Sequence, residues 1–421
     1  MSSEPEQVSE QNHGLVRRDI LRGAAAGAVG ATIGALGGWF ASGAFTTPDD
    51  GGTSRTDGQD GASADPVDPY GEHQAGVVVP ATPQRHGFFM VLELSAVPEA
   101  DAADEAFRVR LGSLLAAWGE RIALLTAPSR AAAGEAARQS AGMFDGAGDL
   151  TVHIGVGSRV LAALDSTLPG VGELGPFVGD DMISADHLGG DLLVAAYGSS
   201  PNDVERAARD IAASAEAVSV RWVQRGFRAP GEGTITRNPL GFHDGVIVPR
   251  TAQERAENVW IDQGPLAGGT VCVIRRLQLA IERFQAEPLE RQEAIIGRRR
   301  RDGSPLSGGE PFAEANLASK TAEGEFLIPA RSHVRAAHPS FTGSALMLRR
   351  GYAFDNGAFG GLADAGLMFV CFQRDLRSFV QTQLRLDETD DLMAYATPTA
   401  SGAFVILPGY SAERPLGSSL R

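Results

Sequence analysis

Apolar runs and amphipathic stretches alternate along the chain after residue 70 and predict short strands and helices. In the first half, residues 106–118 and 203–217 carry apolar side chains three and four positions apart, which indicates helices. Apolar runs around them predict strands at residues 88–94, 150–156, 191–197 and 218–224. The order strand–helix–strand–strand–helix–strand is typical of a ferredoxin-like α+β unit.

A similar order recurs in the second half. Helical spacing covers residues 277–284, 287–296 and 376–386, and apolar runs predict strands at residues 269–274, 345–348, 366–373 and 403–407. Residues 298–326 show no regular pattern. Two halves of like order indicate a duplicated fold, with a functional site in the second half or between the two.

The N-terminal residues follow a different plan. Arg17 and Arg18 precede a Gly/Ala-rich apolar run at residues 23–40, and small residues follow at 41–44. This arrangement indicates an export signal, and the arginine pair favours the twin-arginine (Tat) route, which carries folded proteins. The alternative is an uncleaved membrane anchor, because the run is about long enough to span a bilayer, although its many glycines make it a poor one.

The pattern therefore predicts four segments. Residues 1–44 form the Tat signal segment, and residues 45–69, rich in Asp, Gly, Ser and Thr, form a disordered linker. Residues 70–230 form an N-terminal ferredoxin-like domain, and residues 231–421 form a C-terminal one. We accordingly expect an extracytoplasmic protein that is secreted, periplasmic or associated with the cell envelope.

Composition narrows the classes of function. The 421 residues, 43% of them hydrophobic, allow two domains with a sizeable core. The net charge of -15 argues against nucleic-acid binding, which needs a positive surface. Cys272 and Cys371 both lie in apolar runs, which excludes a disulfide framework and a cysteine-rich zinc site. One bridge between them stays open, but two buried thiols fit the pattern better.

Two polar stretches are candidates for chemistry. His333 precedes Arg349 in the chain, and imidazole is the commonest haem-iron ligand. An arginine near iron stabilises charge on a bound oxygen species. Upstream, Gly241 and Gly245 bracket Asp244 in a loop that can turn tightly and approach a ligand. On residue types alone, a structural histidine at His333 and a turn residue at Asp244 are the more frequent interpretations.

Laid end to end, these segments resemble the dye-decolorizing peroxidases, and in particular their exported subgroup, from about Tyr70 to Tyr410. An ordered set of motifs carries the resemblance: Gly71-Glu72-His73-Gln74-Ala75-Gly76, Arg237-Asn238, Gly241-Phe242-His243-Asp244-Gly245, Gly268-Gly269-Thr270, Gln292-Glu293, Ile296-Gly297-Arg298, Ser332-His333-Val334-Arg335, Leu348-Arg349-Arg350-Gly351-Tyr352, Gly366-Leu367-Met368-Phe369 and Phe372-Gln373-Arg374-Asp375. One such motif alone is weak evidence, whereas the ordered set is specific.

The resemblance implies a haem b peroxidase with one haem per chain, built from two ferredoxin-like domains in a DyP-type α/β barrel arrangement with haem in the C-terminal half. It implies that His333 binds the iron and that Asp244 and Arg349 lie on the distal face of the haem. It also implies a carboxylate bonded to the far nitrogen of His333. Asp390 matches this carboxylate better than Asp391, with an ordinary helix N-cap as the alternative for Asp390.

The chain departs from the family pattern near these residues. His338 stands where the family usually has Asn, so a second imidazole lies close to the expected ligand. His243 takes a position that is commonly basic. Residues 246–248, Val-Ile-Val, replace the more usual Thr-x-Asn, which changes the hydrogen bonding expected at the haem edge.

The resemblance further implies reduction of hydrogen peroxide and oxidation of dye- or phenol-type reductants through a ferryl intermediate. Asp244 is then the group that moves a proton between the peroxide oxygens, which predicts an acidic optimum, and Arg349 stabilises negative charge. Large dyes cannot enter a closed pocket, so surface aromatic residues are candidate electron relays, although each is more often ordinary core: Trp222, Trp260, Tyr352 and Tyr395.

Two other functions stay open at this point. One is an exported haem-handling or iron-acquisition protein that releases iron from haem. The other is a haem-binding module without turnover, against which the presence of both Asp244 and Arg349 argues. The partners implied are hydrogen peroxide, an organic reductant and the Tat export machinery, with homo-oligomers common in the family and no nucleic acid.

Overall fold

The computed structural model describes residues 65–102, 104–172, 174–359 and 362–420. The helices in these ranges are α2 (Glu105–Thr126), α3 (Ala131–Ser140), α4 (Ser158–Leu164), α5 (Pro201–Ala213), α6 (Ala252–Asn258), α7 (Ile281–Gln285), α8 (Leu289–Ile296), α9 (His333–Ala336), α10 (Pro339–Thr342) and α11 (Leu376–Thr389). The strands are β1 (His86–Leu94), β2 (Thr151–Gly157), β3 (Leu192–Gly198), β4 (Val218–Phe227), β5 (Thr236–Arg237), β6 (His243–Asp244), β7 (Thr270–Leu279), β8 (Leu348–Arg349), β9 (Tyr352–Phe359), β10 (Leu362–Gln373) and β11 (Ala396–Ile406). The expected signal segment and most of the expected linker lie outside the described residues.

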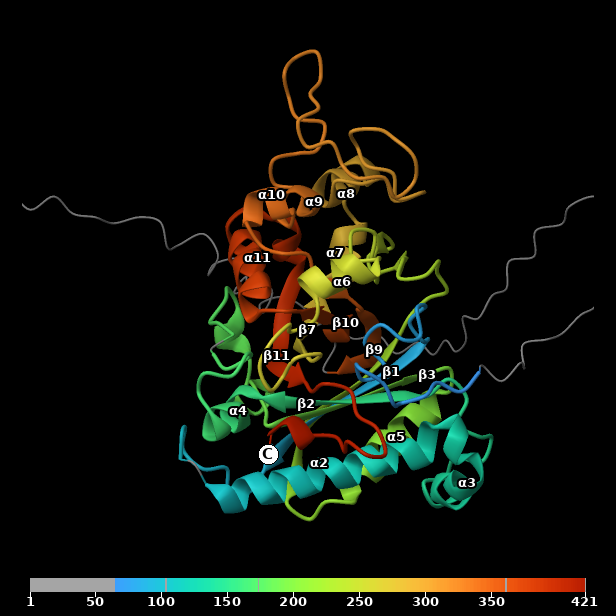
Figure 1. The fold of residues 1–421 in the computed structure, drawn as a ribbon. Helices are drawn as coiled ribbons and strands as arrows, with labels where there is room; N and C mark the ends of the chain where they lie inside the picture. Colours follow the sequence, from blue (N-terminus) through green and yellow to red (C-terminus); the bar gives the residue numbers. More distant parts are fainter. Residues whose placement is uncertain (1–64, 103, 173, 360–361, 421) are drawn as a thin grey trace, which may run out of the picture. The chain divides into compact units, whose positions relative to one another are not determined.

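Two sets of four antiparallel strands repeat one order. The first half of the chain gives β4-β1-β3-β2, and the second half gives β11-β7-β10-β9. In each set the first strand in sequence lies between the fourth and the third, which is the ferredoxin-like arrangement. The duplicated α+β fold expected from the sequence is therefore confirmed (Figure 1).

The two sets close into a ring through two short joins. β11 pairs with β2 from Phe404↔Gly157 to Ile406↔Gly155, and β4 pairs with β9 only at Phe227↔Ala353. The ring is therefore a barrel of eight strands within the described ranges, with the short strand β8 added beside β9 on the edge of β10.

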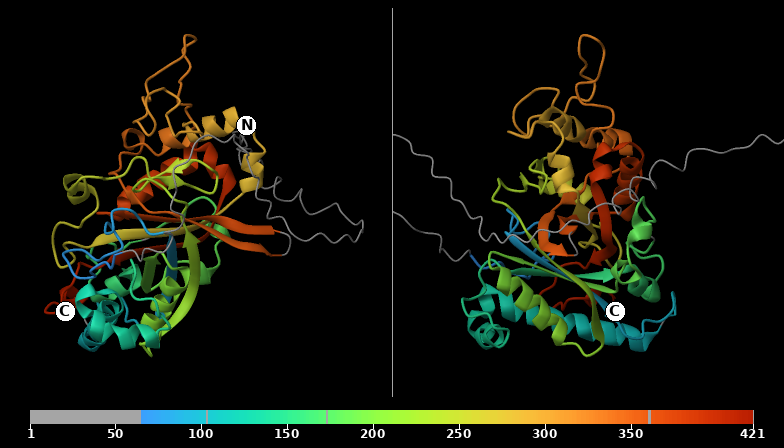
Figure 2. Two further views of the ribbon diagram at one scale, coloured as in Figure 1. Left: turned by 90° about the vertical axis from the view of Figure 1, so that its right-hand side faces the viewer. Right: turned by 180° about the vertical axis from the view of Figure 1, so that it is seen from behind.

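Alternating side chains of these strands build two hydrophobic cores. One face fills the barrel with residues that include Phe89, Tyr197, Ile274 and Phe404. The other face packs under helices, where Trp118 of α2 is fully buried. Helices α2 and α5 run side by side against the strands of the first half, and α9 to α11 gather on the other side of the barrel (Figures 1 and 2). Strands buried on both faces explain why they appear as continuous apolar runs in the sequence.

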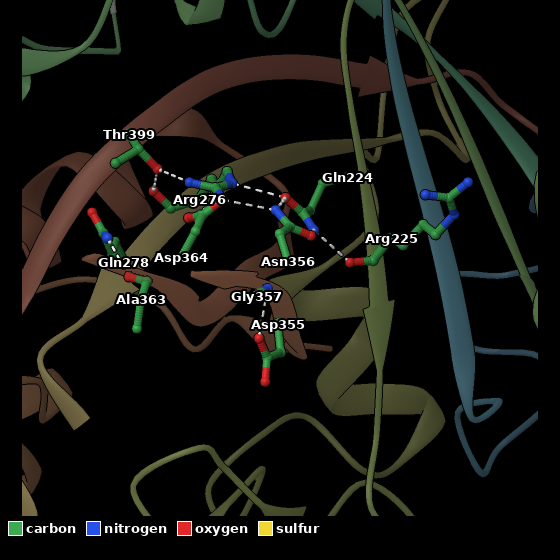
Figure 3. Close-up of polar contacts among 10 residues, drawn as sticks. All are labelled: Gln224, Arg225, Arg276, Gln278, Asp355, Asn356, Gly357, Ala363, Asp364 and Thr399. Atoms are coloured by element: carbon green, nitrogen blue, oxygen red, sulfur yellow. Dashed lines mark hydrogen bonds and ion pairs between the residues drawn. The ribbon is translucent and has the colours of Figure 1, made fainter. Parts of the chain in front are cut away.

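Side chains bridge the β4–β9 join where backbone pairing is lacking (Figure 3). Gln224 of β4 bonds Asn356 of β9 at 3.2 Å and accepts from Arg276 Nε of β7 at 2.8 Å. Arg276 also donates to Thr399 Oγ1 and pairs with Asp364, so one guanidinium ties β4, β7, β10 and β11 together. The Arg276 guanidinium also lies over the ring of Phe354, 4.2 Å from its centroid.

Several elements differ from the sequence prediction. Residues 277–279 continue strand β7 and do not begin a helix, which starts only at Ile281. Strand β9 was not predicted, because Asn356-Gly357 has the pattern of a turn, yet these residues form an irregularity inside the strand where its register to β10 shifts. Residues 298–326 contain no helix or strand, as expected. Within the described ranges, no helix combines the length and apolar character needed to cross a membrane.

Candidate functional site

His333 is the first residue of the short helix α9, and Asp390 ends α11 beside it. His333 Nδ1 donates to Asp390 Oδ2 at 2.6 Å, while Asp390 Oδ1 accepts from the backbone N–H of Leu392 at 2.9 Å. Asp390 therefore fills both roles considered for it, the histidine partner and a helix N-cap. Its side chain is fully buried, whereas 38% of the His333 side chain is exposed.

Buried polar contacts fix the position of α9. The Ser332 hydroxyl donates to Pro329 O at 2.9 Å, and Arg335 donates to the carbonyls of Ile328 and Leu317 at 3.0 and 2.6 Å. Both Ser332 and Arg335 are buried. The irregular segment before α9 is thus tied to the helix that presents His333.

Burial disfavours a charged imidazole, but the Asp390 carboxylate outweighs it and raises the pKa of His333 above its ordinary value. Asp391, the alternative to Asp390, instead pairs with Arg291 and Arg331 at 3.0 and 2.6 Å. Only Asp390 of the two therefore contacts the histidine. The arrangement holds the proton on Nδ1 and leaves Nε2 as the nitrogen that can bind a metal.

Asp244 and Arg349 come from two short strands that the barrel brings together. Arg349 Nη2 lies 3.4 Å from Asp244 Oδ1, and Arg349 Nη1 donates to Ile247 O at 3.0 Å. The N–H of Gly245 donates to Asp244 Oδ1 at 2.6 Å. Both charged side chains keep about a quarter of their surface exposed, 26% for Arg349 and 29% for Asp244. The pair is therefore open to a small molecule.

The loop that carries Asp244 needs its glycine. Gly245 has φ +78, and a Cβ there would lie 2.2 Å from the carbonyl oxygen of Thr234. Thr234 Oγ1 in turn donates to Gly245 O at 3.0 Å. Only glycine allows this close approach in that backbone conformation.

Charges around Asp244 keep it ionised. Burial would raise the pKa of its carboxyl, but Arg349, the N–H of Gly245, His333 and Arg228 together lower it below the ordinary value. Asp244 conversely raises the pKa of His333. The Asp244 carboxylate and the His333 imidazole therefore lie near enough for each to influence the charge of the other.

A small cavity of about 10 Å³ reaches Asp244 and Arg349. That is about the volume that one water molecule requires. Arg228, Thr234 and Gly351 also border it. Arg228 donates to Gly351 O at 2.7 Å and to Thr234 O at 3.0 Å, so it closes the cavity at the β4–β9 join. The sequence analysis did not find Arg228, because it belongs to no motif.

The donor set fits haem iron. The described residues contain no group of three or more His, Cys, Asp or Glu side chains arranged to hold a metal ion. A metal bound at His333 would therefore need most of its ligands from a cofactor, as iron has in porphyrin. The open Nε2 of His333, its buried carboxylate partner and the charged pair within electrostatic reach of it meet that requirement.

The other residues that the sequence singled out make contacts outside this site. His338 caps α10, where its Nδ1 accepts from the N–H of Ser340 at 3.2 Å. Trp222, Tyr352 and Tyr395 are buried core residues, and Trp260 stacks on the ring of His73 at 3.6 Å. Cys272 and Cys371 are both free, as expected, and belong to different hydrophobic clusters.

Comparisons with known proteins cover nearly all of the described chain. Residues 74–228 match the family model described as Dyp-type peroxidase, N-terminal, and residues 235–411 match Dyp-type peroxidase, C-terminal. A dye-decolorizing peroxidase of Thermobifida fusca is 30% identical over 435 aligned residues, covering 97% of this chain and 98% of the relative. A deferrochelatase of Yersinia pestis is 32% identical over 378 residues, covering 83% and 84%.

This chain is also similar to solved structures. The oxyferrous complex of DtpA from Streptomyces lividans superposes with a TM-score of 0.74 at 29% identity, covering 85% of this chain and 98% of that one. A DyP-type peroxidase from Cellulomonas bogoriensis superposes with a TM-score of 0.74 at 30% identity, with the same coverage.

Proposed function

We propose that this chain, which belongs to the Dyp-type peroxidase family, reduces hydrogen peroxide, and that Asp244, Arg349 and His333 belong to the site that would hold its haem. The chain is a peroxidase and haem is its cofactor. The assignment of these residues rests on one arrangement: the Asp244–Arg349 pair, 3.4 Å apart, lies within electrostatic reach of a histidine whose Nδ1 is held by a buried carboxylate.

Haem, when bound, would supply the redox-active iron. His333 would hold the iron through Nε2, and Asp390 would make the imidazole more electron-rich through Nδ1. Asp244, kept ionised by Arg349, takes a proton from one peroxide oxygen and returns it to the other, so that water can leave. Arg349 stabilises the negative charge that develops on the oxygen atoms.

The size of the cavity separates the two substrates. A space of about 10 Å³, close to what one water molecule requires, cannot hold an aromatic ring. We therefore assign dye- and phenol-type reductants to electron transfer at the protein surface. Trp260, which is partly exposed and stacked on His73, is the candidate that the packing favours.

The absorption spectrum of the purified mature chain tests the ligand. The parent protein should show a haem band that His333→Ala removes or shifts, while His338→Ala leaves it unchanged. Steady-state dye oxidation with hydrogen peroxide should likewise be lost in His333→Ala and retained in His338→Ala. A band that survives His333→Ala unchanged would move the ligand elsewhere.

A second function is favoured by the relatives named deferrochelatase, which cover most of this chain. Under this proposal the protein removes iron from haem and leaves the porphyrin ring intact. Incubation with haem, followed by fluorescence of free porphyrin, distinguishes it from peroxide-dependent dye oxidation. Iron release without dye oxidation would favour the second function.

We also propose that the protein is exported by the Tat route, which Arg17 and Arg18 support. Replacing both with lysine should retain the chain inside the cell. Fractionation of cells that express the parent and the variant measures this directly, and equal export of the two would argue against the route.

A further inference from the structure

A second small cavity also reaches Arg349 but is not lined by Asp244. Its volume is about 20 Å³, more than the roughly 10–15 Å³ that one water molecule needs. Thr234 borders both cavities, so the two lie next to each other on either side of the Arg349 side chain.

Three arginine residues border this cavity. Arg255 comes from α6, Arg349 from β8, and Arg350 follows directly in the chain. Arginine stays protonated in proteins, and the other lining residues are Thr234, Leu348 and apolar residues of the segment 77–83, so no carboxylate borders the cavity. Arg349 pairs with Asp244, outside the lining, at 3.4 Å, whereas Arg255 and Arg350 have no ion-pair partner among the residues that the structure describes.

Arg350 is a buried cation with neutral partners. Only 2% of its surface is exposed. It donates to Gly76 O at 2.5 Å and to Tyr352 OH at 3.3 Å, and it lies 4.5 Å from the ring centroid of Tyr197. Across the described ranges it makes no ion pair. A buried charge without a counter-ion is costly, which favours an anion nearby.

Arg255 gives a second, independent observation that favours an anion in this cavity. Its Nε is buried and has no hydrogen-bond partner, and its guanidinium makes no ion pair with any residue that the structure describes. A buried N–H of a charged group without an acceptor is rare in folded proteins. A ligand that accepts hydrogen bonds would satisfy it.

We propose that this cavity binds a small monovalent anion, with chloride or bromide as the fitting class. Arg255 and Arg350 supply positive charge that no described carboxylate balances, and the apolar cover of residues 77–83 limits water access, which strengthens the attraction. Sulfate and phosphate are too large for about 20 Å³. The binding itself does not depend on the function proposed above, whereas its consequence for the peroxide reaction does.

The consequence acts through Arg349. An anion in this cavity offsets part of the positive charge that Arg349 presents to Asp244 and to peroxide. We therefore infer that halide slows the reaction with peroxide without binding the iron. Arg255 is a positioning residue for the anion and touches neither peroxide nor haem in this scheme.

Bromide provides the probe, because its anomalous X-ray scattering locates it. Crystals of the haem-loaded protein soaked in bromide should show an anomalous peak between Arg255, Arg349 and Arg350. In solution, the rate of reaction with peroxide should fall with bromide and reach a plateau, at ionic strength held constant with sulfate. The absorption spectrum of the resting haem should not change.

Variants of Arg255 separate the site from general salt effects. Arg255→Gln should react at the parent rate without halide but need at least tenfold more bromide for the same slowing, and Arg255→Lys should restore the response. Arg110→Gln, which removes an exposed arginine of α2, is the matched control and should behave like the parent.

Bromide found only at the iron, or an empty cavity together with the same halide response in Arg255→Gln, would overturn the proposal. A peak in the cavity without any change of rate would keep the binding site and reject its action through Arg349. Loss of peroxide reactivity in the parent protein would instead contradict the function proposed above and leave the crystallographic test unaffected.

Discussion

Asp390 offers a direct test of how the protein tunes its haem. One carboxylate oxygen bonds His333 Nδ1 at 2.6 Å, and the other caps the turn at Leu392 at 2.9 Å. Asp390→Asn keeps an oxygen for the cap but loses the negative charge. Asp390→Ala loses both. The two variants therefore separate the effect on the histidine from the effect on the backbone.

The expected change in the haem reduction potential follows from the hydrogen bond between His333 and the fully buried Asp390 side chain. A hydrogen bond to a charged group contributes about 1.5–3 kcal/mol, and the carboxylate favours the oxidised iron by making its ligand more electron-rich. Since about 59 mV corresponds to a tenfold change for one electron, loss of the charge should raise the haem reduction potential by about 65–130 mV. Asp390→Ala should lose a further ~1 kcal/mol of folding stability with the cap.

Spectroelectrochemical titration of the haem-loaded protein measures the potential, and urea unfolding measures stability. Asp391→Asn is the control, because Asp391 pairs only with Arg291 and Arg331 in the described structure, and it should leave the potential unchanged. A parent-like potential in Asp390→Asn would refute the reasoning and reduce Asp390 to an N-cap.

Four further outcomes follow from the site. Because the pKa of Asp244 is lowered in the folded protein, its carboxylate stays ionised to lower pH, and the rate of reaction with peroxide should stay constant down to pH 3.8, the ordinary pKa, and decrease at lower pH. Arg349→Leu should shift this decrease to higher pH in rapid-mixing experiments. The same experiments should show that Arg349→Leu lowers the rate by about 10²–10³, at least as much as Asp244→Asn does, and the reverse order would contradict the role of Arg349. Gly245→Ala should cost at least about 1–3 kcal/mol in urea unfolding, because of its positive φ and the facing carbonyl. A reducing agent should leave the melting temperature unchanged, since both cysteines are free; a lowered melting temperature would indicate a bridge.

Much of the strand order could be predicted because strands such as β1, β2 and β3 are buried on both faces. The run at residues 88–94 became β1 (His86–Leu94), and the run at 150–156 became β2 (Thr151–Gly157). Local pattern failed where a tertiary contact decides the structure. Strand β9 contains Asn-Gly yet pairs with β10, and β7 extends to Leu279 because β11 pairs along its length.

The candidate site was accessible from the sequence only through the ordered motifs. His333, Asp390, Asp244 and Arg349 are far apart in the chain, and no periodicity links them. Their contacts depend on how the strands pair when the barrel closes, and the sequence pattern does not specify the register of that pairing. Arg228 was missed for the same reason, because it gains its role only where β4 meets β9.

The single backbone pair that joins β4 to β9 has a consequence for motion. Each of the other joins of the ring contains several paired residues, and this one contains only Phe227↔Ala353. Fewer backbone hydrogen bonds must break there, so we expect local opening of the barrel to begin at this join. The amide protons of the join should therefore exchange early with solvent. The cavity beside Asp244 lies at the same place. The cavity beside Asp244 and the join with the fewest backbone pairs are thus one structural element, and opening of this join should widen the path by which a small molecule reaches Asp244 and Arg349.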